Sequence, residues 1–220
     1  SMCRGKFANF NVQDDDPNNY KKSTLINIDV IPNLTKNNKK WKCVINHEFM
    51  RNLNLYQTIT DLYKPVHPKL SFKPKYSIKA SSKKYIEPLQ YSENYKNVIT
   101  QLSGTKLVRL FSPKNRKKLY LDERFNPSLK NSKINIWLDH NELYKKYPKL
   151  KETEFIDIIL RPGNTLIIPN FWLYSTQNLE DSVSLHCELN TIFSYLIQIP
   201  NSLLNLSHEF GLYKNKNCYC

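Results

Sequence analysis

The clearest structural signal in this chain is the segment Arg161-Pro-Gly-Asn-Thr-Leu-Ile-Ile-Pro-Asn-Phe-Trp-Leu-Tyr174. The Pro-Gly pair at 162–163 predicts a turn, because glycine adopts backbone angles that other residues avoid. Residues 165–168 predict a short strand, which Pro169 ends because proline has no amide hydrogen to give to a sheet. A short strand held between two turns is typical of all-β proteins.

Short strands separated by turn residues continue on both sides of this stretch. We expect strands at 25–31, 98–102, 106–111, 134–137, 155–160 and 182–189. We expect helical character at 41–63, a brief helix or turn at 143–151, and a partly helical segment at 191–206 broken by Pro200. Residues 69–84 carry lysines among apolar residues and fit either an edge strand or an exposed loop. Many short strands with helices mostly near the ends predict a mainly β, double-sheet jelly roll.

The chain length sets the domain organisation. A chain of 220 residues is enough for one sizeable core, so one domain is expected. We expect a flexible lead-in at 1–23, where the sequence is polar, a single domain at 24–206, and a C-terminal tail at 207–220.

The net charge of +14 and the five cysteines bear on partners and location. Lysine outnumbers arginine 27 to 6, so any nucleic acid or other polyanion bound by this basic surface would be contacted mainly at its phosphates. The scattered cysteines and the lack of a signal peptide or a membrane-length apolar run favour an intracellular protein, cytoplasmic or nuclear, with no visible targeting signal.

Several motifs occur in a recognisable order. Residues 97–113 contain Asn, Gln, Gly-x-Lys and Leu-Phe-x-Pro; Leu-x-Pro-Gly follows at 160–163, Ile-Pro-x-x-Trp at 168–172, and Ser-Val-Ser-Leu at 182–185. This ordered set, over residues 85–190, resembles the JmjC and cupin-like Fe(II)/2-oxoglutarate oxygenases. The resemblance implies a double-stranded β-helix of the cupin/JmjC type with N- and C-terminal helical decorations.

The same resemblance implies an iron site whose ligands are changed here. The family binds Fe(II) with two histidines and one carboxylate, and Tyr174 occupies the position of the closing histidine. Counting back from Lys106 without a gap places Tyr91 and Glu93 at the other two positions. A one-residue shift, which matches Pro-Leu-Gln-Tyr-Ser at 88–92 with the family's Pro-x-His-Tyr-Asp, places Gln90 and Ser92 there instead. Both alignments lose the histidine, so no metal is expected.

The resemblance also implies a site for the cosubstrate. Lys106 and Asn97 stand at positions that contact 2-oxoglutarate in family members, and His186 stands where the family often has a cosubstrate-binding asparagine. These three residues form a candidate pocket for a 2-oxoglutarate-like ligand. The alternatives are that Lys106 is a solvent-facing lysine after a turn and that His186 is a hydrogen-bonded core residue.

Three functions are compatible with this sequence. The first is an inactive JmjC/cupin-like barrel, without resident cofactor, that binds a protein or peptide partner or acts as a scaffold. The second is an active Fe(II)/2-oxoglutarate hydroxylase or demethylase of protein or RNA, with a non-standard metal site in which Glu93 and His186 are the first candidate ligands. The third is a basic nucleic-acid-associated protein in which the barrel is only a frame.

Overall fold

The structure is a computed structural model. It describes residues 7–13, 24–27, 33, 35–36, 40–51, 55–69, 72–91, 93–121, 130–132, 134–210 and 212.

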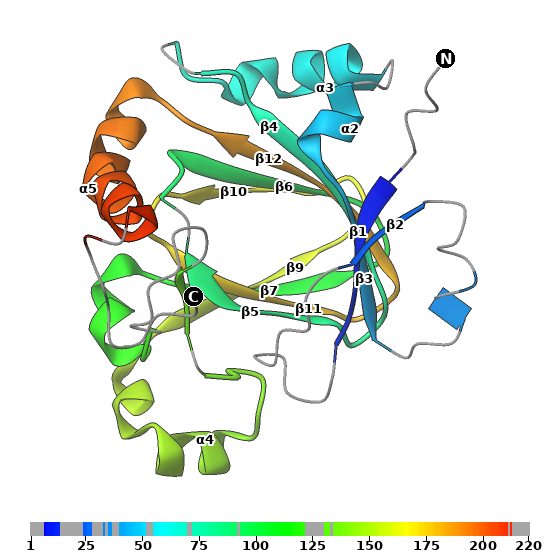
Figure 1. Cartoon of the computed structure of the whole chain (residues 1–220). Helices are drawn as coiled ribbons and strands as arrows, with labels where there is room; N and C mark the ends of the chain where they lie inside the picture. Colours follow the sequence, from blue (N-terminus) through cyan, green and yellow to red (C-terminus); the bar gives the residue numbers. More distant parts are fainter. Residues whose placement is uncertain are drawn as a thin grey trace.

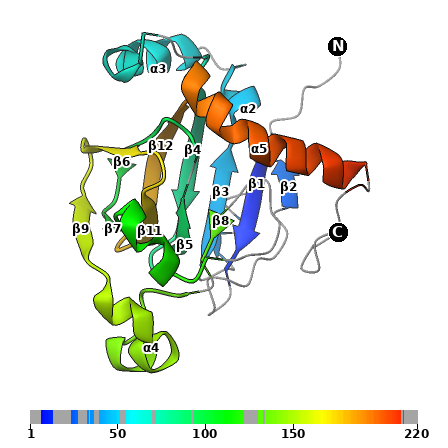
Figure 2. The ribbon, with the colours of Figure 1, turned by 90° about the vertical axis from the view of Figure 1, so that its left-hand side faces the viewer.

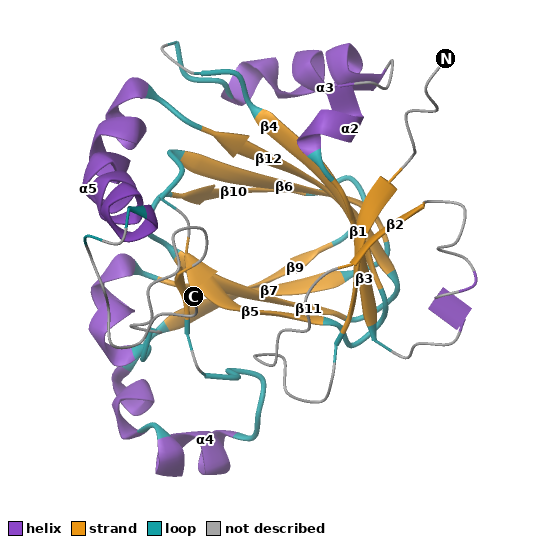
Figure 3. Cartoon of the chain, in the orientation of Figure 1, coloured by secondary structure: helices purple, strands orange, loops and turns teal. Residues whose placement is uncertain are grey.

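Two antiparallel sheets face one another and form the body of the molecule (Figure 1, Figure 3). The larger sheet has the order β10 (Thr165–Pro169), β6 (Lys96–Ser103), β12 (Ser182–Leu189), β4 (Lys75–Ser81), β3 (Trp41–Ile45), β1 (Phe7–Val12), β2 (Thr24–Asn27). The smaller has the order β8 (Lys130–Asn131), β5 (Ile86–Tyr91), β11 (Leu173–Asn178), β7 (Lys106–Phe111), β9 (Phe155–Leu160). The predicted mainly β, double-stranded β-helix is confirmed.

Helices cover the outer faces of both sheets. The helices α2 (His47–Arg51) and α3 (Leu55–Tyr63), followed by the 3-10 turn η2 (Lys64–Val66), pack on the outer face of the larger sheet. The helix α4 (His140–Lys146) and the 3-10 turn η4 (Pro148–Glu152) pack on the outer face of the smaller sheet. The 3-10 turn η3 (Pro113–Lys118) lies beside η4. The last helix, α5 (Ile192–Glu209), runs across the end of the barrel, in front of β4, β3 and β1 in Figure 2. Within the described residues, no helix has the length and apolarity needed to span a membrane.

Alternation along the strands separates an apolar outside from a polar inside. On β12, Leu185, Cys187 and Leu189 pack beneath α2 and α3, whereas Ser184 and His186 point the other way. Successive strand residues face opposite sides of a sheet, so each strand supplies one row to each face. The interior between the sheets therefore combines an apolar cluster around Ile99, at one end, with buried polar side chains.

Several strands follow the expected ranges closely. β7 and β9 have the predicted bounds, β10 and β12 differ by at most one residue, and the C-terminal segment is a helix with Pro200 inside it. The segment at 69–84 contains a strand, β4, but β4 lies centrally between β12 and β3 rather than at an edge.

Other expectations were wrong. Residues 41–45 form β3 rather than the start of a helix, because their apolar positions alternate in a sheet. Residues 134–137 are not a strand: Ile134 and Ile136 are buried beneath α4 from a turn. The expected flexible lead-in at 1–23 contains β1, which pairs with β2 and β3, and α5 continues past the expected domain end at 206. Residues 14–23, 28–32 and 213–220 lie outside the described residues.

Candidate functional site in the barrel interior

The residue in the closing histidine's position, Tyr174, faces the barrel interior. It packs with Ile99 of the larger sheet and with Leu110 of the smaller sheet. Its direct cross-strand partner is Gln90 on β5. Burial, reinforced by the negative charges of Glu87 and Glu188, raises the pKa of Tyr174, so the phenol stays protonated at neutral pH.

Tyr91 lies on the opposite face of the smaller sheet. It packs with Phe111 and Leu119 outside the barrel, and Arg116 Nη2 donates a 2.7 Å hydrogen bond to its hydroxyl. Burial raises the pKa of Tyr91, the positive charge of Arg116 opposes this rise, and the negative charge of Glu93 adds to it. The sequence allowed two alignments, which assign either Tyr91 or Gln90 to the position of the first iron-binding histidine. Only the alignment that assigns Gln90 places that residue opposite Tyr174. Ser92 lies outside the described residues.

A β-bulge on β5 brings a second polar residue to the inner face. Tyr174 pairs with Gln90, but two residues later Thr176 pairs with Glu87, so β5 carries one extra residue between these pairs. A bulge of this kind reverses the alternation that follows it. As a result Gln90 and Glu87 both point inward, although they are three positions apart.

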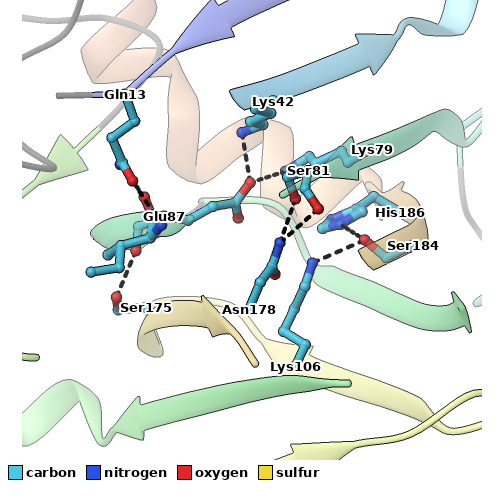
Figure 4. A network of polar contacts seen from close by, with 11 residues as sticks. Gln13, Lys42, Lys79, Ser81, Glu87, Lys106, Ser175, Asn178, Ser184 and His186 are labelled. Carbon is cyan, nitrogen blue, oxygen red and sulfur yellow. Dashed lines mark hydrogen bonds and ion pairs between the residues drawn. The ribbon is translucent and has the colours of Figure 1, made fainter. Parts of the chain in front are cut away.

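Glu87 is a buried carboxylate held by two lysines from the larger sheet (Figure 4). Lys42 Nζ lies 2.6 Å and Lys79 Nζ lies 3.2 Å from Glu87 Oε1. Burial disfavours the charge of Glu87, but the positive charges of the two lysines outweigh this effect and hold its pKa well below the usual range. The other carboxylate oxygen, Oε2, is buried and has no hydrogen-bond partner.

Lys106 and His186 meet at one hydroxyl in the same interior. Lys106 is 2% exposed; its Nζ lies 3.1 Å from Ser184 Oγ, which lies 3.0 Å from His186 Nε2. Burial lowers the pKa of Lys106 to about 8, so the ammonium is charged at neutral pH. Burial and the charge of Lys79 lower the pKa of His186 well below its usual value, so the imidazole is neutral.

The predicted pocket residues are only partly brought together. Lys106 and His186 share Ser184, and Lys106 is buried rather than solvent-facing. Asn97 is also buried, but its side-chain oxygen accepts a 3.1 Å hydrogen bond from Asn94, further along the barrel.

Lys42, Lys79 and Glu87 were not singled out from the sequence. Nothing in a lysine-rich sequence distinguishes these two lysines from solvated ones, and only the pairing of β3, β4 and β12 shows which way they point.

The side chains at the family's iron positions do not fit Fe(II). Ferrous oxygenases use two imidazoles and a carboxylate on one face of the metal, whereas here a neutral amide lies opposite a protonated phenol. Within the described residues, no group of three or more His, Cys, Asp or Glu side chains could hold a metal ion.

The comparisons with known proteins agree with this architecture. The family model described as "Cupin-like domain" matches residues 73–195. Two Dictyostelium discoideum proteins, JmjC domain-containing proteins D and F, are 29% identical over 100 residues and 35% identical over 112 residues. Lysine-specific demethylase 8 of Danio rerio is 29% identical over 99 residues. These matches cover 45–46% of this chain and only 21–23% of each relative.

Solved structures share the fold at low sequence identity. The Escherichia coli protein ycfD superposes with a TM-score of 0.54 at 13% identity, covering 97% of this chain and 49% of that one. A second structure, titled as the ribosomal oxygenase YcfD in complex with cobalt and 2-oxoglutarate, gives the same TM-score, covering 96% of this chain and 47% of that one. The fold defines a double-stranded β-helix protein of the cupin class. The chain belongs to the cupin-like, JmjC-related family.

Proposed function

We propose that this chain is a JmjC/cupin-like barrel that has lost its Fe(II) site and acts as a non-catalytic binding module, holding a small dianion in its interior. The observation that carries the proposal is that Tyr174 and Gln90, a phenol and an amide, face each other across β11 and β5 where the resemblance places two iron ligands. A phenol whose pKa is raised by burial is a poor ligand for ferrous iron at neutral pH.

The charge balance of the interior supports an anionic ligand. The lysines of this region, Lys42, Lys79 and Lys106, outnumber its acidic groups, Glu87 and Glu188, and His186 is neutral. Burial lowers the pKa of Lys79, an effect that the charge of Glu87 opposes. Unbalanced buried positive charge is costly, and a small dianion would offset it. A dicarboxylate or a phosphate has this charge and accepts the hydrogen bonds that an ammonium donates.

The test is to compare ligand binding with and without metal. Melting temperature and calorimetric titration would be measured with succinate, 2-oxoglutarate and phosphate, each in EDTA and each with Fe(II) or Mn(II), alongside an assay for succinate release from 2-oxoglutarate. We expect at least one dianion to bind equally well in EDTA, with no succinate released. Metal-dependent binding with turnover would refute the proposal in favour of an active oxygenase.

A matched pair of variants locates the site. Lys106→Met should weaken dianion binding at least tenfold, because it removes the most deeply buried ammonium. Lys114→Met removes an exposed lysine from η3 and should leave binding unchanged. Equal losses in the two variants would mean that the anion binds to the basic surface rather than to the interior.

A further inference from the structure

Two buried side-chain oxygens in the barrel interior have no hydrogen-bond partner among the described residues. They are Oε2 of Glu87 and Oε1 of Gln101, and these residues are 5% and 0% exposed. Buried polar atoms in folded proteins nearly always have a partner, so each such atom calls for one. Both atoms are acceptors, and the missing partner is therefore a group that donates a hydrogen bond.

Strand pairing places both acceptors close to one hydroxyl. On the larger sheet, Ser184 of β12 pairs with Gln101 of β6 on one side and with Lys79 of β4 on the other. Residues that pair directly across neighbouring strands share a face of the sheet, so these three form one inward row. Glu87 is joined to this row at Lys79, whose Nζ lies 3.2 Å from Glu87 Oε1. The two unpaired acceptors thus lie on either side of Ser184.

The opposite sheet supplies a cation at the middle of this row. Lys106 Nζ lies 3.1 Å from Ser184 Oγ. An ammonium has three hydrogens, and Ser184 takes one of them, so two remain for an anion. In Figure 4 the ammonium of Lys106 and the carboxylate of Glu87 point into the same space between the sheets. A ligand in that space meets a donor on one side and an unpaired acceptor on the other.

The charge of the region decides which donor the ligand carries. The lysines Lys42, Lys79 and Lys106 already outnumber the acidic groups Glu87 and Glu188. An ammonium on the ligand would add a further positive charge beside these lysines, whereas a hydroxyl donates a hydrogen bond without adding charge. A carboxylate is the matching acceptor for a lysine ammonium. Two carboxylates and one hydroxyl on a small skeleton meet all of these requirements.

We propose that the interior ligand is a hydroxy-dicarboxylate, whose hydroxyl donates a hydrogen bond to Glu87 Oε2 while a carboxylate accepts one from Lys106. This inference rests on the proposed function, because it places its ligand in the same interior. It goes further in requiring a donor on the ligand. Succinate and 2-oxoglutarate carry no such donor, since their ionised carboxylates and the ketone only accept hydrogen bonds.

Three dicarboxylates with the same four-carbon skeleton test the hydroxyl. Succinate has no donor, malate has a hydroxyl, and aspartate has an ammonium at the same carbon. Calorimetric titrations of the whole chain in EDTA would use each stereoisomer separately. The better malate enantiomer should bind at least about tenfold more tightly than succinate, because hydrogen bonds to charged groups are among the strongest in proteins. It should also bind more tightly than either enantiomer of aspartate.

The outcomes separate this inference from the proposed function. Equal affinities for malate and succinate would overturn the inference and leave the non-catalytic dianion site standing. A preference for aspartate would also overturn it, because the ligand would then carry an ammonium. Failure of all three compounds to bind would overturn the inference, and the proposed function would fall with it if 2-oxoglutarate and phosphate also failed.

Glu87→Gln tests which atom receives the hydroxyl. The glutamine oxygen can stay on the lysines, and its amide nitrogen then faces the ligand as a donor. The preference for malate over succinate should therefore fall below about threefold. The matched control is Glu180→Gln at an exposed carboxylate, which should keep the full preference.

A second variant keeps the test valid if Glu87→Gln does not fold. Lys79→Met/Glu87→Gln also removes one of the buried positive charges, and it is measured by the same ratio of malate to succinate affinity. Circular dichroism of each variant checks that the barrel is folded. A tenfold preference for malate that survives the loss of the Glu87 carboxylate would overturn the assignment of the hydroxyl to this residue.

Discussion

Tyr174 on β11 and Gln90 on β5 lie directly opposite each other across a strand pair. The resemblance to the oxygenases assigns an iron ligand to both positions. In this structure a phenol faces an amide there, inside the barrel. The bulge beside this pair turns Glu87 inward as well, which links the changed iron positions to the lysine cluster.

Removing the Tyr174 hydroxyl tests whether this pair is structural. Tyr174→Phe should lower the free energy of unfolding by about 1 kcal/mol, because it removes a buried polar group that faces the amide of Gln90. The half-buried Tyr144 on α4 provides the control, and Tyr144→Phe should change stability by less than about 0.5 kcal/mol. Urea unfolding with and without Mn(II) measures both. A metal-induced stabilisation of wild type that disappears in Tyr174→Phe would instead identify Tyr174 as a ligand.

Lys106 gives a pH-dependent prediction. Its pKa is lowered from 10.5 to about 8 by burial, so between these pH values the unfolded chain keeps a proton that the folded chain has released. Stability rises with pH wherever the unfolded state binds more protons. Relative to Lys106→Met, wild type should therefore gain about 3 kcal/mol as the pH rises from 8 to 10.5. Urea unfolding across this range measures the difference, and the exposed-lysine variant Lys114→Met should differ from wild type by a constant amount.

Sequence patterns predicted strands where turn residues bound them on both sides. β7 lies between Gly104 and Pro113, and β9 ends just before the Pro-Gly turn, so their ranges were found from local signals. β5 and β11 were missed because they carry polar residues on their inner faces, and a strand such as Leu173–Asn178 lacks the apolar alternation that marks a half-buried strand. β1 was missed because a polar segment follows it.

The candidate site was predictable only in part, for a related reason. Motif order located Lys106, His186 and Tyr174, which do face one interior. The choice between Gln90 and Tyr91 depends on which side of β5 each residue faces, and a one-residue shift exchanges the two faces of a strand. Lys42 and Lys79 come from β3 and β4, whose place in the larger sheet is set by pairing with each other and with β12, so no local signal distinguishes the two lysines.

Glu87 should be essential to the stability of the lysine cluster. Glu87→Gln removes the charge that faces Lys42 and Lys79. This change should lower the free energy of unfolding by about 3–5 kcal/mol, because buried positive charges are left uncompensated. The double variant Lys79→Met/Glu87→Gln should lose less than the sum of the single losses, since it also removes one of those charges. Strict additivity would contradict the ion pair. In wild type, the Glu87 charge contributes fully to the free energy of unfolding above pH 4.5, the ordinary pKa of a glutamate. This contribution should be lost as the pH falls through the lower pKa that Glu87 has in the folded state.

Two glycines with positive φ allow backbone strain to be separated from a steric clash. Gly104, with φ of 70°, turns the chain between β6 and β7, and a Cβ there would overlap the backbone oxygen of Asp181. Gly163, with φ of 87°, lies in the Pro-Gly turn and has open space around its Cα. Gly163→Ala should therefore lower the free energy of unfolding by about 1 kcal/mol, which is the conformational strain of an alanine at positive φ. Gly104→Ala carries the same strain plus a clash with backbone that cannot move without disturbing Ser182, and should cost more than about 3 kcal/mol. Thermal and urea unfolding compare the two variants directly, and equal losses would show that the Asp181 backbone can shift to admit a methyl group.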